Sequence, residues 1–139
     1  MQEPLDLAID TAGIARLTIN RTNRANSLDA ELTAALMAAL ERCAEDPNVR
    51  IIVLLAQGRT FCAGVDLNWM KKIGAAAFED NYEDALNVAK MLHRLNTMPM
   101  PVVAVVTLME RIFGAASGWL FSPVLELVIT DAAAIAART

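Results

Sequence analysis

Apolar and polar residues alternate at the start of the chain, and the spacing then becomes helical. The alternation covers residues 5–9 and 14–19, on either side of the turn-forming segment 10–13. Because a period of two places every second side chain on one face of a strand, this pattern predicts an antiparallel β-hairpin. Every fourth residue is then a leucine, at Leu28, Leu32, Leu36 and Leu40. This spacing predicts an amphipathic helix whose apolar face belongs to the core and carries no chemistry.

The apolar run at residues 50–56 predicts a strand inside a sheet that is covered on both faces, and residues 101–106 predict a second buried strand. Between them, residues 78–95 carry apolar side chains at roughly helical spacing and predict a second amphipathic helix. A strand, a helix and a strand in this order predict a right-handed crossover between parallel strands. The chain is therefore expected to be an α/β protein with a mostly parallel sheet.

Length and composition limit the classes of function. The chain has 139 residues, enough for one domain with a real core, and we expect residues 1–139 to form a single unit. Hydrophobic residues make up 55% and the mean hydropathy is +0.38, which favours burial of further surface against a partner subunit. The net charge of −4 and the pI near 4.9 argue against a nucleic-acid partner.

Membrane, secretory and metal-binding classes also find little support. The most apolar stretch, residues 112–129, is interrupted by glycine, proline and glutamate, so it predicts no membrane span. The acidic start predicts no secretory signal, and Cys43 and Cys62 fit small apolar residues of a reducing compartment, so a cytoplasmic protein is expected. These cysteines and His93, expected at the surface near a helix end, have no metal-site spacing.

The segment after the first apolar strand is the candidate for chemistry. It runs from Arg59 to Met70 and reads R-T-F-C-A-G-V-D-L-N-W-M. Gly64 lets the backbone approach a ligand, and the N–H groups that follow it are placed to hold an oxyanion at a helix start. Asp66 falls in the first helical turn, where a carboxylate caps free N–H groups. By itself, such a strand–turn–helix joint is common in α/β proteins and favours a purely structural role.

Residues 61–70 resemble the first signature of the crotonase superfamily, the enoyl-CoA hydratase/isomerase family. They look most like the members that act on branched, carboxylated enoyl-CoA thioesters such as 3-methylglutaconyl-CoA. The resemblance implies that the Val65 backbone N–H is one donor of the thioester oxyanion hole. It also implies that Ala63 lines the adenine end of the CoA site, in one segment with Gly64, Asp66 and Leu67.

An upstream polar loop extends the resemblance. The family has an R-P-x-x-x-N-A-L type of loop here, matched by Arg21, Arg24, Asn26 and Leu28, with Thr22 in the place of the usual proline. Alone, this segment predicts a solvated basic loop. The resemblance implies that Arg24 and the adjacent Ala25 contact CoA. Ser27 is expected to cap the helix that follows.

Beyond Val106 the resemblance weakens. Residues 113–118 can be laid over the family's glycine-rich motif, which places Ala115 at the second oxyanion-hole N–H. Gly118 falls where many hydratases carry a catalytic glutamate, and Glu110 and Glu126 do not match the position of the family's base. The segment 107–126 departs from the family, and residues 127–133 rejoin its pattern. The expected fold is the N-terminal half of a crotonase-like (ClpP/crotonase) domain of ββα repeats, truncated.

The resemblance implies that the chain hydrates an α,β-unsaturated acyl-CoA through an enolate held by Val65 and Ala115. Coenzyme A enters as part of the substrate, with no other cofactor and no metal, and the family's habit implies a trimer-type homo-oligomer. No catalytic acid is identified, so hydration by this chain alone is expected to be weak or absent. Two alternatives stay open: a non-catalytic CoA-binding or subunit-interaction fragment, and an inactive truncated product.

Overall fold

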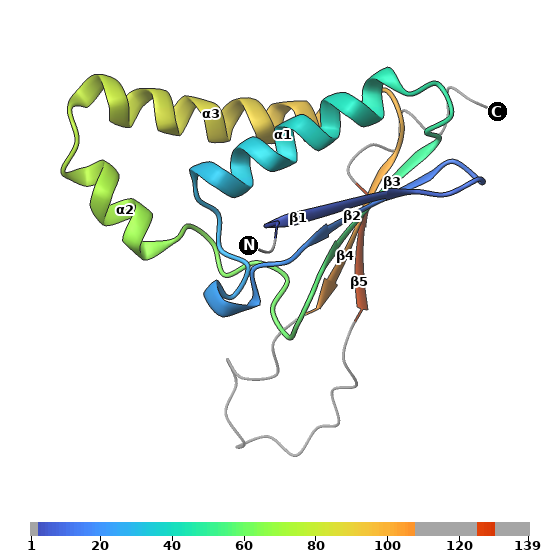
Figure 1. Cartoon of the computed structure of the whole chain (residues 1–139), viewed down its shortest axis with the longest axis horizontal. Coiled ribbons are helices and arrows are strands. Elements are labelled where there is room, and N and C mark those ends of the chain that lie inside the picture. The colour runs from blue at the N-terminus through green and yellow to red at the C-terminus, as the bar shows by residue number, and fades with distance from the viewer. Residues whose placement is uncertain (1–2, 108–124, 130–139) are drawn as a thin grey trace, which may run out of the picture.

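A five-stranded sheet carries helices α1 and α3 on one face in the computed structural model (Figure 1). The structure describes residues 3–107 and 125–129. Its strands are β1 (Leu5–Ile9), β2 (Ile14–Ile19), β3 (Ile51–Ala56), β4 (Val102–Thr107) and β5 (Leu125–Ile129). Its helices are α1 (Ala30–Glu45), α2 (Leu67–Gly74) and α3 (Phe78–Asn96), with a short 3₁₀ turn, η1 (Thr22–Arg24), before α1.

The strands lie in the order β1-β2-β3-β4-β5. β1 and β2 form the predicted hairpin, with Leu5 opposite Ile19 and Ile9 opposite Ala15. β2 pairs in parallel with β3, and β3 in parallel with β4, because α1 and then α2 with α3 provide the crossovers. β5 runs antiparallel to β4. The α/β class is confirmed, but the sheet is mixed rather than mostly parallel.

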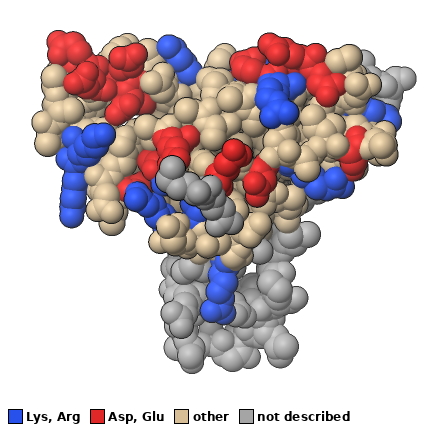
Figure 2. All heavy atoms as spheres, viewed as in Figure 1, with Lys and Arg blue, Asp and Glu red and all other residues tan. Residues whose placement is uncertain are grey.

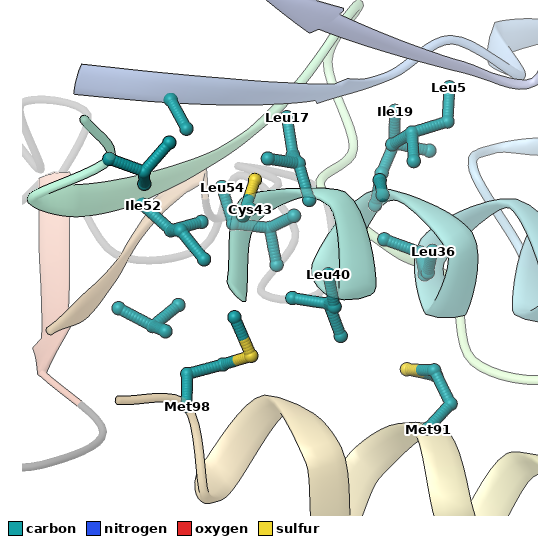
Figure 3. Close-up of a cluster of buried hydrophobic side chains, with 14 of the residues drawn as sticks. Leu5, Leu17, Ile19, Leu36, Leu40, Cys43, Ile52, Leu54, Met91 and Met98 are labelled. Carbon is teal, nitrogen blue, oxygen red and sulfur yellow. The ribbon is translucent and has the colours of Figure 1, made fainter. Parts of the chain in front are cut away.

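The core lies between the sheet and the helices (Figure 3). Leu17, Ile52 and Leu54 project from the sheet toward Leu40 of α1, and α3 contributes Met91. The apolar face predicted for α1 is confirmed, since Leu32, Leu36 and Leu40 are all buried. Cys43 is also buried, and this burial raises the pKa of its thiol. It packs as a small apolar residue.

The opposite face of β3 is less covered than its sequence predicts. Ile52 and Leu54 are buried, whereas Ile51, Val53 and Leu55 remain partly exposed in the described part of the chain. Helices α1 and α3 lie on one face of the sheet, the face that carries the buried Ile52 and Leu54 (Figure 1). The expectation that this strand is covered on both faces is therefore wrong for residues 3–107 and 125–129. No helix in those residues is long and apolar enough to cross a membrane.

Thr33 of α1 gives a direct prediction about stability. Its side chain is 3% exposed, and its hydroxyl has no hydrogen-bond partner among the described residues. Because a buried polar group without a partner is costly, Thr33→Val, which keeps the shape, should stabilise the fold by about 1 kcal/mol. Urea unfolding measures this change, and Thr33→Ser, which keeps the hydroxyl, should give no such gain. A valine variant that unfolds at lower urea would contradict the prediction.

Candidate functional site

The turn between β3 and α2 takes its shape from Gly64. This residue has φ +91°, a left-handed conformation that side chains rarely adopt. A Cβ added at Gly64 would meet no atom of the described residues within 4 Å. Glycine is therefore needed here for backbone conformation, and residues 3–107 and 125–129 leave the space beside it open.

Val65 is held by a short parallel bridge to Leu28. The Leu28 N–H donates to the Gly64 carbonyl at 2.8 Å, and the Asp66 N–H donates to the Leu28 carbonyl at 2.8 Å. Since groups alternate in direction along an extended segment, the Val65 N–H points away from Leu28. It has no acceptor within the described ranges, and Val65 is 41% exposed. The predicted oxyanion donor is thus fixed in direction and available.

Asp66 caps α2, as its position in the sequence predicts. Its Oδ1 accepts from the backbone N–H groups of Asn68 and Trp69, each at 2.9 Å. Its Oδ2 lies 3.2 Å from Arg24 Nη1 and 3.4 Å from Ser27 Oγ. The carboxyl is 6% exposed, and its pKa lies below the ordinary value, chiefly because Trp69 donates to it and also because Arg24 does. Asp66 therefore ties the helix start to the loop of Arg24.

The lowered pKa of Asp66 predicts an acid-sensitive contribution to stability. A carboxyl whose pKa is lower in the folded than in the unfolded state stabilises the fold at neutral pH, and this stabilisation is lost as pH falls through the folded pKa. Asp66→Asn should therefore lose stability at pH 7 and show a smaller further loss below about pH 4 than the wild type. Urea unfolding at pH 7 and pH 3 tests this. Equal acid sensitivity of both proteins would contradict it.

The loop before α1 lies against the same turn. The Ala63 N–H donates to the Ala25 carbonyl at 3.1 Å, and Ala25 itself has φ 48°. The Arg24 side chain is 46% exposed and uses Nη1 to contact Asp66, so further guanidinium N–H donors face solvent. Leu67 begins α2 and is 72% exposed. The structure therefore brings together the six residues assigned to CoA: Arg24, Ala25, Ala63, Gly64, Asp66 and Leu67.

Asn26 holds this arrangement together, a role that the sequence pattern did not assign. It is 1% exposed, its Oδ1 accepts from the Arg21 N–H at 2.8 Å, and its Nδ2 donates to the carbonyls of Gln57 at 2.8 Å and Thr60 at 2.7 Å. The match of Asn26 to the family loop was the available signal. A buried amide that links two loops is a positioning group.

Arg21 fixes the other side of the loop. The side chain of Arg21 is buried, donates to the Ser27 carbonyl at 2.9 Å and pairs with Asp29. Asp29, rather than Ser27, caps α1, because its side chain accepts from the Leu32 N–H at 3.0 Å. The cap predicted at Ser27 is therefore wrong. Ser27 instead donates to the Arg24 carbonyl at 2.8 Å, which stabilises the loop.

The other residues considered from the sequence are Ala115 and His93. Ala115 lies outside the described residues, so the second oxyanion donor stays a prediction. His93 is exposed in the last turn of α3, at the helix end where it was expected. Within the described ranges, no three histidine, cysteine or acidic side chains are grouped to hold a metal ion.

A separate groove of about 400 Å³ lies among the three helices. Thr33, Met37 and Val88 line its apolar walls, and Asp84 and Trp69 contribute from α3 and α2. Trp69 is the part of this lining that belongs to the Arg59–Met70 segment, and none of residues 62–66 lines the groove.

Comparisons with known proteins agree on one family. A family model described as enoyl-CoA hydratase/isomerase matches residues 10–137. A putative enoyl-CoA hydratase of Thermus thermophilus is 34% identical over 98 residues, 70% of this chain and 39% of that protein. A probable enoyl-CoA hydratase of Mycobacterium tuberculosis is 30% identical over 116 residues, 84% of this chain and 41% of that protein. The chain thus spans roughly two fifths of the length of these curated relatives.

Solved structures show the same likeness. A putative enoyl-CoA hydratase/isomerase (crotonase) from Legionella pneumophila superposes with a TM-score of 0.72 at 33% identity, over 76% of this chain and 40% of that one. An enoyl-CoA hydratase from Mycobacterium smegmatis gives a TM-score of 0.70 at 33% identity, over 76% and 40%. The matched part of this chain therefore has the fold of these proteins.

Proposed function

The chain belongs to the enoyl-CoA hydratase/isomerase family, and we propose that it binds an acyl-CoA thioester at the turn formed by residues 62–66. The proposal rests on the N–H of Val65, which the bridge to Leu28 holds in direction and which has no acceptor among the described residues. The oxygen of a thioester carbonyl can accept a hydrogen bond from this N–H. Because Gly64 has no side chain, the acyl-CoA can approach the protein backbone closely there.

The proposed reaction is hydration of an α,β-unsaturated acyl-CoA. Its acyl group is proposed to be branched, as in the family members that the motif resembles most. Water adds its oxygen to the β-carbon and releases one proton, and the electron pair of the double bond moves toward the thioester oxygen. The α-carbon then takes up one proton, so that the H and OH of one water are added overall. The intermediate is an enolate whose negative charge lies on the thioester oxygen. Val65, with Ala115 as its proposed partner, donates to that oxygen, and such donors usually supply the largest electrostatic stabilisation.

The CoA portion is proposed to lie across the loop of Arg24. Its guanidinium keeps free donors on the solvent side, where phosphate oxygens form charge-assisted hydrogen bonds. Ala25 and Ala63, joined through their backbones, offer a small-residue surface for the adenine end. The exposed Leu67 offers apolar contact at the start of α2. CoA is part of the substrate here, and the proposal includes no further cofactor.

Proton transfer is not assigned to Asp66. Both of its oxygens are engaged, by the α2 backbone and by Arg24, and its lowered pKa keeps it ionised. A general base must reach the water or the α-carbon with an oxygen that is free to take a proton. The second candidate function is therefore CoA-thioester binding without turnover. A crotonyl-CoA hydration assay with purified chain separates the two, because binding without loss of the double bond supports the second.

Arg24→Ala tests the proposed CoA contact. The variant removes the exposed guanidinium and should weaken acetyl-CoA binding by roughly tenfold or more, since hydrogen bonds to charged groups contribute about 1.5–3 kcal/mol. Isothermal titration measures the change. Arg42→Ala, which removes an equally charged side chain from the end of α1, serves as the control and should bind as the wild type does. Equal affinity of Arg24→Ala and wild type would contradict the proposed contact.

A further inference from the structure

Ser27 lies at the junction between the loop of Arg24 and the segment that contains Val65. It is 6% exposed, and it directly precedes Leu28, the residue that bridges to Val65. Its carbonyl accepts from Nη1 of the buried Arg21 side chain at 2.9 Å. Ser27 is therefore held in place by buried contacts of its own backbone.

The Ser27 hydroxyl lies between the main chain of Arg24 and the carboxylate that binds its side chain. Oγ donates to the Arg24 carbonyl at 2.8 Å, and the Ser27 backbone N–H donates to the same carbonyl at 3.0 Å. Oγ also lies 3.4 Å from Oδ2 of Asp66, the oxygen that contacts Arg24 Nη1 at 3.2 Å. A hydroxyl has one hydrogen and therefore donates to one of these acceptors at a time. Ser27 thus restricts both the Arg24 backbone and the carboxylate that pairs with its guanidinium.

The proposed phosphate contact depends on the local placement of Arg24. The chain has a net charge of −4, and basic side chains are scattered among acidic ones on the face that Figure 2 shows. A concentrated positive patch would attract phosphates over a range of positions. One partly exposed guanidinium that is paired with Asp66 forms hydrogen bonds with them only where its remaining N–H donors point. A small change in the direction of this side chain should therefore lower the affinity for CoA.

We propose that Ser27 is a positioning residue of the acyl-CoA site, which acts on the ligand through Arg24 and does not touch it. Its hydroxyl holds Arg24 where the guanidinium reaches the CoA phosphates while the thioester oxygen lies at the Val65 N–H. Because Leu28, the next residue, holds Val65, one short segment sets the distance between the two contacts. The inference rests on the acyl-CoA site proposed above.

A double-mutant cycle, measured by isothermal titration with acetyl-CoA, tests this role. Ser27→Ala should weaken binding about threefold, because it removes one neutral hydrogen bond that orients Arg24. In the Arg24→Ala background the same substitution should change the affinity by less than about 1.5-fold, since the side chain through which Ser27 acts is absent. A residue that only supports the fold would weaken binding in both backgrounds. Ser27→Cys, which keeps the shape and a weaker donor, should give an intermediate affinity.

Thr97→Ala is the matched control. Thr97 Oγ1 donates to the His93 carbonyl at 2.9 Å, so the variant also removes a hydrogen bond from a hydroxyl to a carbonyl, but at the end of α3. It should bind acetyl-CoA as the wild type does, and urea unfolding checks that each variant is folded. Equal affinity of Ser27→Ala and wild type, or an equal loss in both backgrounds, would overturn the inference and leave the proposed function standing. A folded wild type that does not bind acetyl-CoA would overturn both.

Discussion

Asn26→Ala is expected to lower the free energy of unfolding by about 3 kcal/mol and to abolish measurable acetyl-CoA binding. The side chain is buried and makes three hydrogen bonds, so its removal leaves an N–H and two carbonyls without their partner. Asn26 also has φ 54°, a conformation that asparagine tolerates better than alanine does. The loop of Arg24 should then separate from the segment 57–60. Urea unfolding and isothermal titration measure the two effects.

Asn23→Ala provides the matched control on the same loop. Asn23 is exposed and lies in η1, so its replacement should change unfolding by less than about 0.5 kcal/mol and leave binding intact. If Asn26→Ala were as stable as this control, Asn26 would not be the group that positions the loop. Binding retained by a destabilised but folded Asn26→Ala would show that the loop is dispensable for CoA.

Gly64→Val should weaken acyl-CoA binding strongly, with a smaller effect on the fold. The left-handed φ of Gly64 is unfavourable for any side chain and most so for a β-branched one, so the turn must change its conformation. Because a Cβ there meets no described atom within 4 Å, backbone strain rather than a clash with residues 3–107 or 125–129 drives the change. The rearranged turn no longer directs the Val65 N–H outward. The variant loses the Val65 hydrogen bond and also the contacts that the turn makes with CoA. Affinity for acetyl-CoA should therefore fall by at least about tenfold.

Gly74→Ala is the control for this substitution. Gly74 ends α2 and its φ is not positive, so alanine adopts its backbone conformation without strain. A Cβ added there would meet no atom of the part of the chain that the structure describes within 4 Å. We expect unchanged binding and equal or slightly higher stability, because alanine favours helices more than glycine does. Wild-type affinity of Gly64→Val would contradict the role given to the turn.

Local patterns predicted most of the fold. The alternation at residues 5–9 and 14–19 predicted the hairpin correctly. The leucines at every fourth position predicted the buried face of α1 correctly. Both patterns are local, because each reflects a single element that packs against the core. Burial of β3 on both faces was harder to predict. Its apolar residues favour burial, but the packing of other elements on the sheet decides which of its faces is covered. Capping was also ambiguous, since Ser27 and Asp29 are both good caps and only Asp29 reaches the Leu32 N–H.

The sequence predicted which residues make up the candidate site, but not the side-chain contacts that hold them in place. The motif placed Val65, Gly64 and Asp66 in one segment, and their bonds with Leu28 and Arg24 confirm that two distant segments meet there. The supporting contacts of Asn26 and Arg21 depend on side-chain directions that spacing does not encode. The structure adds the reason why the Val65 N–H has no acceptor within residues 3–107 and 125–129: it belongs to a bridge in which the Gly64 carbonyl and the Asp66 N–H bond to Leu28.

Val65 is proposed to donate its backbone N–H to a thioester carbonyl. Amide NMR of the ¹⁵N-labelled chain, titrated with acetyl-CoA and separately with free CoA, detects this hydrogen bond at the donor itself. Both ligands should shift the amides of Arg24 and Ala63, whereas only acetyl-CoA, which has the carbonyl, should move the Val65 proton downfield. A Val65 amide that stays in place while acetyl-CoA saturates the site, or no shift with either ligand, would contradict the claim.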